Sequence, residues 1–140
     1  MIKGTKMKRM HVEISKCIAC NTCQLACSFS QYKPGQNMRK TRVHVYKMKE
    51  EKGIPVLCLE CEEAACVKVC PTKALFRDEN LGIVDVDQEK CISCKMCVAA
   101  CPFGNIALDN DEKTIGKCDL CHGNPLCAIF CPTGALQYRN

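Results

Sequence analysis

The chain has 140 residues, enough for one domain or two very small halves, and a formal net charge of +5. Sixteen residues are cysteine, and without them too few large apolar side chains remain, none of them tryptophan, for an extensive side-chain core. No apolar run approaches the roughly 18 residues of a membrane span, and the basic N-terminus lacks the apolar segment of a signal peptide.

These absences predict a cytoplasmic protein without a membrane span, and in the cytoplasm crowded cysteines are more often metal ligands than disulfides. A subunit without its own signal can also be exported together with a partner that has one. The five basic residues among the first 16 are expected to form a solvated tail rather than a docking surface for an acidic partner.

The first predicted element is a strand in residues 10–14, where apolar and polar side chains alternate. Motif one follows with the spacing C-x2-C-x2-C-x3-C, at Cys17, Cys20, Cys23 and Cys27. No proline follows Cys27, so the helix that contains it should continue a little further. A turn at 33–35 and an alternating segment at 41–47 then predict a hairpin that packs over motif one or contacts a partner.

Motif two has a wider middle gap and is followed by a proline; it consists of Cys58, Cys61, Cys66 and Cys70. Residues 74–77 and 83–86 flank a turn-forming segment and predict a β-hairpin. Motif three repeats the spacing of motif one and is also followed by a proline; it consists of Cys91, Cys94, Cys97 and Cys101. Another short hairpin is predicted at 106–108 and 114–116, around 109–111.

Motif four has the widest middle gap and again a following proline; it consists of Cys118, Cys121, Cys127 and Cys131. A last strand is predicted at 135–138. Every motif begins with C-x2-C and ends with C-x3-C, and residues 70–75 and 131–136 are nearly the same sequence. The chain therefore repeats one unit four times: a cysteine motif, a helical turn and a strand, with a proline after all but the first motif.

The spacing of motif three, with its proline, is the one that bacterial ferredoxins use to bind [4Fe–4S] clusters. Three cysteines two residues apart can surround one small cubane, and the fourth lies one helical turn further on. Zinc sites usually draw their ligands from two separated pairs, so three evenly spaced cysteines argue against zinc. Sixteen cysteines in four complete sets predict four [4Fe–4S] clusters.

Two further expectations follow from the clusters. Four cubane cores of about 2+ and their 16 thiolates would bring the net charge to about −3, so the basic sequence does not predict nucleic-acid binding. In two-cluster ferredoxins the fourth cysteine of each motif ligates the other cluster, so four motifs should form two paired units.

From Cys17 to Leu136 the motifs and their order resemble the four-cluster iron–sulfur subunits of molybdenum and tungsten oxidoreductases, such as those of dimethyl sulfoxide reductase and formate dehydrogenase. The gap between Cys121 and Cys127 is shorter than is usual in that family, and the chain lacks the usual C-terminal extension or anchor. In size it is most similar to the small polyferredoxin subunits of tungsten aldehyde oxidoreductases.

The resemblance implies a nested pairing of motif one with motif four and of motif two with motif three. In the first pair, one cluster would be bound by Cys17, Cys20, Cys23 and Cys131, and the other by Cys118, Cys121, Cys127 and Cys27. In the second pair, one cluster would be bound by Cys58, Cys61, Cys66 and Cys101, and the other by Cys91, Cys94, Cys97 and Cys70.

The expected fold class is α+β, with two pseudo-twofold, bacterial-ferredoxin-like dicluster modules made of short helices and β-hairpins around four clusters. Residues 1–57 and 102–140 would form the first module, and residues 58–101 the second, nested inside it. The N-terminal strand near Val12 should then pair with the C-terminal strand near Leu136.

The resemblance implies a non-catalytic electron-transfer subunit that relays single electrons to or from a catalytic large subunit, in an anaerobic setting. That partner would be a molybdenum or tungsten pterin enzyme such as an aldehyde oxidoreductase, with a ferredoxin or flavin subunit as the second redox partner. The alternatives are a free-standing polyferredoxin and a zinc or disulfide scaffold. No catalytic triad or phosphate-binding glycine loop is present, and His122 is expected to be exposed.

The charges near the motifs predict differences in reduction potential. Glu60, Glu62 and Glu63 crowd the loop of motif two, whereas each of the other motifs has a lysine directly before its first cysteine. Negative charge disfavours the addition of an electron, so the motif-two cluster should have the lowest potential, to the extent that water does not screen the glutamates.

Overall fold

The computed structural model describes residues 7–30, 41–108 and 115–140. Within these ranges, four short α-helices lie among four two-stranded antiparallel sheets, an arrangement consistent with the expected α+β class. The predicted turns at 33–35 and 109–111 lie outside the described residues.

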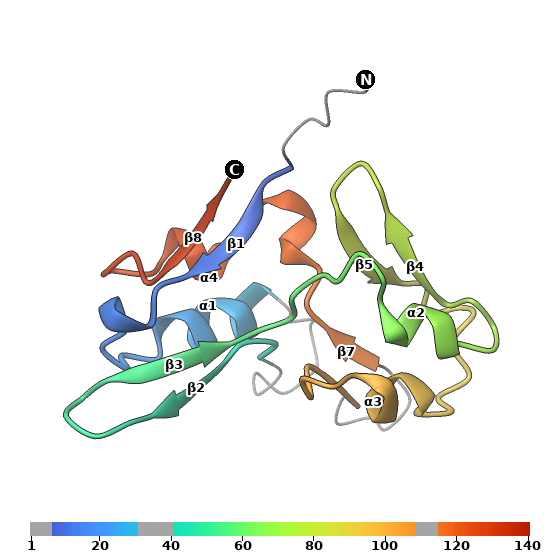
Figure 1. Cartoon of the computed structure of the whole chain (residues 1–140), viewed down its shortest axis with the longest axis horizontal. Helices are drawn as coiled ribbons and strands as arrows, with labels where there is room; N and C mark the ends of the chain where they lie inside the picture. The colour runs from blue at the N-terminus through green and yellow to red at the C-terminus, as the bar shows by residue number, and fades with distance from the viewer. Residues whose placement is uncertain (1–6, 31–40, 109–114) are drawn as a thin grey trace.

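One half of the molecule is built from the two ends of the chain (Figure 1). Strand β1 (Arg9–Val12) pairs with β8 (Leu136–Arg139), and Val12 lies opposite Leu136, so the expected pairing of the terminal strands is confirmed. Helix α1 (Thr22–Ser30) packs against α4 (Leu126–Ile129). Strands β2 (His44–Lys47) and β3 (Gly53–Val56) form a hairpin in the same half.

The other half is formed by the middle of the chain. Helix α2 (Ala65–Val69) packs against α3 (Met96–Ala100). Strands β4 (Leu75–Asp78) and β5 (Ile83–Val86) form the hairpin expected after motif two. Strands β6 (Ile106–Leu108) and β7 (Ile115–Lys117) pair after motif three.

Two local predictions need adjustment. The strand expected at residues 10–14 ends at Val12, and Ile14–Lys16 forms a 3₁₀ turn that leads the chain into motif one. Strand β3, which contains Pro55, was not predicted. A two-stranded sheet leaves one edge of each strand free, so a strand can accommodate a proline there.

Prolines decide where the helices end. Helices α2 and α3 both stop one residue before the cysteine that precedes a proline, since that cysteine is pushed out of the helical region. Helix α1 lacks such a proline and runs three residues past Cys27, as expected.

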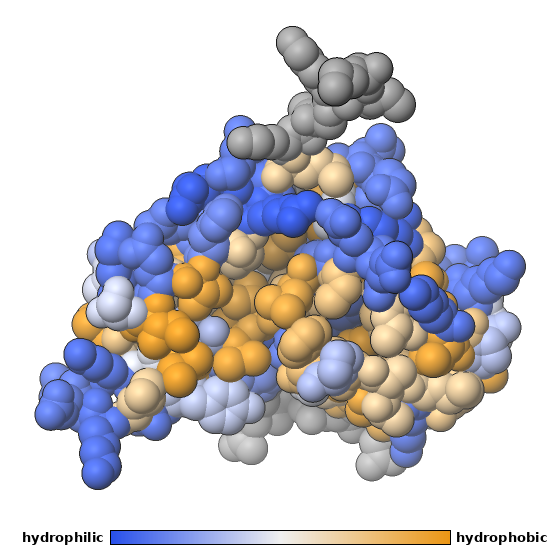
Figure 2. Space-filling view, viewed as in Figure 1, coloured by the Kyte–Doolittle hydropathy of each residue, from blue (hydrophilic) through white to orange (hydrophobic). Residues whose placement is uncertain are grey.

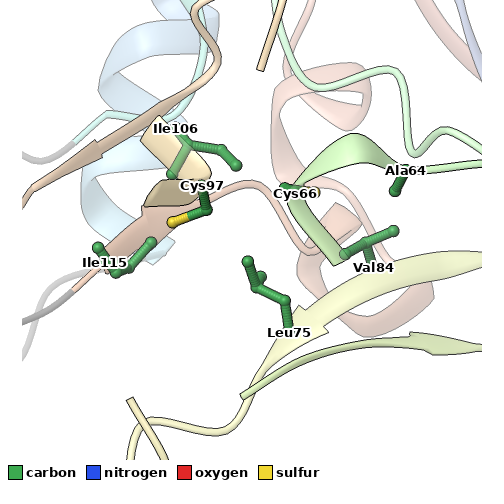
Figure 3. Packing of buried hydrophobic residues seen from close by; sticks show 7 residues of the cluster. All are labelled: Ala64, Cys66, Leu75, Val84, Cys97, Ile106 and Ile115. Atoms are coloured by element: carbon green, nitrogen blue, oxygen red, sulfur yellow. The ribbon is translucent and has the colours of Figure 1, made fainter. Parts of the chain in front are cut away.

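The buried apolar residues form two separate cores, one in each half. In the middle half, the buried side chains converge between α2, α3 and the strands (Figure 3); they are Ala64, Cys66, Leu75, Val84, Cys97, Ile106 and Ile115. A module boundary at residue 101 would assign β6 and β7 to the other half. Their side chains Ile106 and Ile115 instead pack in this core, so the middle half extends to about Lys117.

Candidate metal centres

Four cavities of similar size, with empty volumes between about 310 and 380 Å³, are each lined by four cysteines. We name each by the motif that supplies three of them. The motif-one cavity is lined by Cys17, Cys20, Cys23 and Cys131, and the motif-four cavity by Cys118, Cys121, Cys127 and Cys27. The motif-two cavity is lined by Cys58, Cys61, Cys66 and Cys101, and the motif-three cavity by Cys91, Cys94, Cys97 and Cys70.

All 16 cysteines lie in described residues, none is disulfide-bonded, and each lines one of these cavities. The last cysteine of every motif lines the cavity of another motif, because the helical turn before it separates it from the third cysteine. Cys23 and Cys27, for example, lie one turn apart on α1 and line different cavities. These groups have the membership that the nested pairing requires, and ligation itself stays a prediction.

Each C-x2-C loop has a left-handed residue directly before its second cysteine. The residue before the second cysteine has φ between +49° and +57° in every motif; these residues are Ala19, Glu60, Ser93 and Leu120. None is glycine, so each conformation costs roughly 1–2 kcal/mol. The turn directs the N–H of Glu60 toward Cys58 Sγ at 3.5 Å and that of Leu120 toward Cys118 Sγ at 3.4 Å. The loops thus direct backbone N–H groups toward cysteine sulfurs, and the left-handed residues that make this possible are strained.

The turn after the last cysteine also donates hydrogen bonds to sulfur. The Ala74 N–H lies 3.3 Å from Cys70 Sγ, and the hydroxyls of Thr72 and Thr133 lie 3.8 Å from the sulfurs of Cys70 and Cys131. Burial raises the pKa of the Cys70 thiol, but the backbone at Leu75, the Thr72 hydroxyl and the Ala74 N–H outweigh it and leave the pKa below its ordinary value. These donors favour a thiolate.

Other cysteines are too buried to ionise alone. Burial raises the pKa of Cys58 to about 11 and that of Cys127 to about 12. A buried thiolate needs a positive partner, and iron in a cluster would supply it. The donor set, all cysteine sulfur in cavities of similar size, therefore fits [4Fe–4S] clusters. No group of three or more His, Cys, Asp or Glu in the described ranges converges on a position for a single ion, and a cubane needs none, since its thiolates bind different irons.

A buried ion pair lies where the two halves of the molecule meet. Lys117 Nζ donates to Glu60 Oε2 at 2.9 Å and to the Cys118 carbonyl at 2.7 Å, and the side chains are only 2 % and 7 % exposed. The Val84 N–H also donates to Glu60 Oε2, at 2.7 Å. Burial opposes the charge on Lys117, but Cys58 and Glu60 outweigh it and raise the pKa of Lys117 above its ordinary value.

The sequence singles out Glu60 and Lys117 by their charge and their positions next to cysteines, but it does not predict that they pair. Lys117 directly precedes motif four in the sequence, yet its side chain lines the motif-two cavity. Glu62 and Glu63 are 69 % and 89 % exposed and belong to surface ion pairs with Arg9 and Lys68. Of the three glutamates expected to lower the potential at motif two, only Glu60 is shielded from water.

The last two observations concern the exposure of His122 and the length of the helices. The side chain of His122 is exposed, with Nε2 3.2 Å from Asp119 Oδ2, as expected from the sequence. Among the helices in the described part of the chain, none is both long and apolar enough to cross a membrane.

Comparison with protein families gives two matches, both described as a 4Fe-4S dicluster domain, over residues 50–140 and 16–75. Among curated relatives, the thiosulfate reductase electron transfer subunit PhsB of Salmonella typhi is 36 % identical over 137 residues, covering 88 % of this chain and 70 % of the relative. The electron transport protein HydN of Escherichia coli K12 is 37 % identical over 152 residues, covering 89 % and 83 %.

A longer relative and a solved structure extend the comparison. The NADH-dependent phenylglyoxylate dehydrogenase subunit beta of Aromatoleum evansii is 37 % identical over 128 residues, but the match spans only 28 % of that protein. The active site complex BamBC of benzoyl coenzyme A reductase contains a chain with a TM-score of 0.54 and 27 % identity, covering 94 % of this chain and 78 % of that one.

Proposed function

This chain belongs to the 4Fe-4S dicluster domain family, and we propose that it relays single electrons between a catalytic oxidoreductase subunit and a second redox partner. It is a non-catalytic, ferredoxin-like electron-transfer protein with four [4Fe–4S] clusters, similar to iron–sulfur subunits of oxidoreductase complexes. When bound, each cluster supplies a site that accepts and releases one electron. The remaining proposals concern which residues bind the clusters and which partners are served.

We propose that the four cysteines lining each cavity are the ligands of one cluster. The single observation that supports this is the sorting of all 16 cysteines into four cavities with four cysteines each. The packing of α1 against α4 and of α2 against α3 supports two dicluster modules, each with an internal pseudo-twofold arrangement. The module that contains motifs two and three then runs from about residue 58 to 117.

The accessible ends of the relay are proposed to be the motif-one and motif-three sites. Cys20 and Cys94 are the only two of the 16 cysteines that are exposed. Apolar side chains beside them, Ile18 and Ile92, are also exposed. A partner that covers these residues would exclude water next to the terminal sites.

A stable protein partner is favoured by further exposed apolar side chains. Leu25 and Phe29 on α1, Ile129 on the neighbouring helix α4 and Phe130 directly after α4 are all exposed. Hydrophobic residues also gather across the middle of the face shown in Figure 2. Exposed apolar area of this kind is typical of interaction surfaces, and favours a subunit over a free-standing polyferredoxin.

We propose a molybdenum or tungsten pterin enzyme, such as an aldehyde oxidoreductase, as the catalytic partner, and a ferredoxin or flavin subunit as the second redox partner. The relatives support the class of complex: one is a subunit of a thiosulfate reductase, and one belongs to an NADH-dependent dehydrogenase. The choice of metal and substrate rests on the resemblance in motif order and chain size.

The test is anaerobic purification of the native protein from its own cells, followed by identification and metal analysis of the co-eluting chains. A large subunit that contains molybdenum or tungsten is expected. Elution as a small species with all its iron would identify the free-standing polyferredoxin. A large partner without either metal would retain the subunit role and reject the pterin enzyme.

A further inference from the structure

The two halves of the molecule are joined by two chain segments (Figure 1). Glu60 lies at the first segment and Lys117 at the second, so the buried ion pair links the two segments. At the first segment, Leu57 lines the motif-four cavity and Cys58 the motif-two cavity. At the second, Lys117 lines the motif-two cavity and Cys118 the motif-four cavity. The motif-two and motif-four sites are therefore the neighbouring central sites, and Lys117 and Glu60 lie between them.

We propose that the Lys117–Glu60 ion pair, which lies between Cys58 of motif two and Cys118 of motif four, positions these two ligands and sets the reduction potentials of both central clusters together. The inference rests on the cluster ligands proposed above. Lys117 and Glu60 are positioning residues, since they act through the ligands and not as ligands.

Hydrogen bonds from neighbouring groups hold Glu60 and Lys117 in place. Glu60 Oε2 accepts hydrogen bonds from Lys117 Nζ and the Val84 N–H, and the Glu60 carbonyl accepts one from Arg77 at 3.1 Å. Lys117 Nζ is held in turn by the Cys118 carbonyl. Within the described residues, Glu60 Oε1 is buried without a hydrogen-bond partner. Lys117 lines the motif-two cavity together with Cys58, and the Glu60 carboxylate is bonded to its ammonium group.

The sign of each charge gives the direction of its effect. Reduction adds one electron, supplied by the redox partner, and one negative charge to a cluster. The cation of Lys117 stabilises that added charge and raises the potential, whereas the carboxylate of Glu60 lowers it. Both side chains are almost fully buried, so water and salt screen them far less than the exposed Glu62 and Glu63.

The experiment measures the midpoint potentials of the four clusters by anaerobic redox titration followed by electron paramagnetic resonance, with iron content measured first. Glu60→Gln keeps an acceptor for Val84 and Lys117 and removes the negative charge. Two of the four midpoints should rise, by at least a tenfold change in the oxidised-to-reduced ratio, or about 59 mV for one electron. The other two should stay in place.

Three further variants separate charge from structure. Glu63→Gln, in the same loop but exposed, should move no midpoint. Lys117→Gln should lower the two midpoints that Glu60→Gln raises, and the double variant should return them close to their original values. A purely structural role would lose iron or broaden signals without this opposition of sign.

Unchanged midpoints in Glu60→Gln, shifts of the same sign in both single variants, or an equal shift in Glu63→Gln would overturn the inference. If both single variants lose iron and the double variant keeps it, charge balance at this position is still supported. Loss of iron in both single variants and in the double variant would show that the ion pair only stabilises the structure, and would reject its role in setting the potentials. An incomplete iron content in the unmodified protein would instead count against the proposed ligand sets.

Discussion

Arg77 fixes the loop of motif two through its backbone. Its Nη1 atom donates to the Glu60 carbonyl at 3.1 Å and to the Cys61 carbonyl at 2.8 Å, and the side chain is largely buried. Glu60 has a left-handed backbone, so these bonds help to hold a strained turn between two proposed ligands. At the residue scale, a buried charge that bonds to backbone atoms stabilises more than an exposed ion pair.

We therefore expect Arg77→Met to weaken iron retention at motif two. A hydrogen bond to a charged group contributes about 1.5–3 kcal/mol, so iron should be lost to a chelator about tenfold faster or more. The control is Arg9→Met, because Arg9 bonds to Glu62 at 2.7 Å while both side chains are about two-thirds exposed. Equal rates of iron loss in the two variants would contradict this role for Arg77.

At the scale of elements, the turn after three of the helices is the same structure with different residues. Lys73, Gly104 and Gly134 occupy the third position after the last cysteine, and all three have φ between +55° and +72°. Glycine adopts this conformation readily, and lysine does not. The lysine is exposed, so burial does not explain its presence.

Lys73→Gly should therefore stabilise the holoprotein by about 0.5–1 kcal/mol, which raises its apparent melting temperature by a few degrees at a fixed heating rate. The reverse change, Gly104→Ala, should lower it. A Cβ at Gly104 meets no atom within 4 Å, so only the backbone conformation is penalised. A lower melting temperature for Lys73→Gly would show that the lysine side chain stabilises the turn.

The helical turn between the third and fourth cysteines provides the test of the ligand sets. Cys66 and Cys70 lie one turn apart at α2, but Cys70 lines the motif-three cavity. Cys70→Ala should therefore convert the motif-three cluster to a three-iron form or remove it, and leave the motif-two cluster with its electron paramagnetic resonance signal.

The matched variant is Cys101→Ala, which should affect the motif-two cluster and spare that of motif three. The midpoints that respond to Glu60→Gln identify beforehand the pair of signals that includes motif two, and the midpoints that do not respond identify the pair that includes motif three. If Cys70→Ala removed the motif-two signal, the ligands would not be exchanged between motifs.

Strand patterns predicted the hairpin after motif two, and the family resemblance implied the pairing of the terminal strands. The burial of particular charges could not be predicted, because Lys16, Lys90 and Lys117 occupy the same position before a motif. In the structure, Lys16 and Lys90 form exposed pairs, and only Lys117 is buried, since β7 packs in the middle half. The sequence placed β6 and β7 in the other half because they follow motif three in the chain. Which core a strand joins depends on its tertiary contacts, and Ile106 and Ile115 pack in the middle core.

At the scale of the whole molecule, cysteines occupy positions that large apolar side chains fill in other proteins. Three of the six buried residues of the terminal-half core are Cys23, Cys27 and Cys127. The largest side chains that are almost completely buried in the described residues are only Ile83, Val43 and Val84. The clusters therefore complete both cores, and folding should depend on them.

The first consequence is stoichiometric. Four complete sets of cysteines should bind about 16 iron and 16 sulfide per chain, all in cubane clusters. Iron and sulfide analysis of an anaerobically reconstituted sample measures this directly. Saturation at eight irons would mean that only one pair of sites is occupied.

The second consequence concerns iron removal. Without iron, the thiols of Cys58, Cys118 and Cys127, whose pKa values burial raises, face empty cavities. The left-handed turns before Cys20, Cys61, Cys94 and Cys121 then lose the bonds to iron that offset their strain. We expect the apoprotein, kept reduced, to show no cooperative transition by circular dichroism during a thermal ramp, whereas the holoprotein should melt sharply. The reduced state of the thiols must be verified, since disulfides would stabilise the apoprotein artificially. A sharp transition in iron-free, fully reduced protein would show that side-chain packing alone specifies the fold, and that the clusters are added to a preformed core.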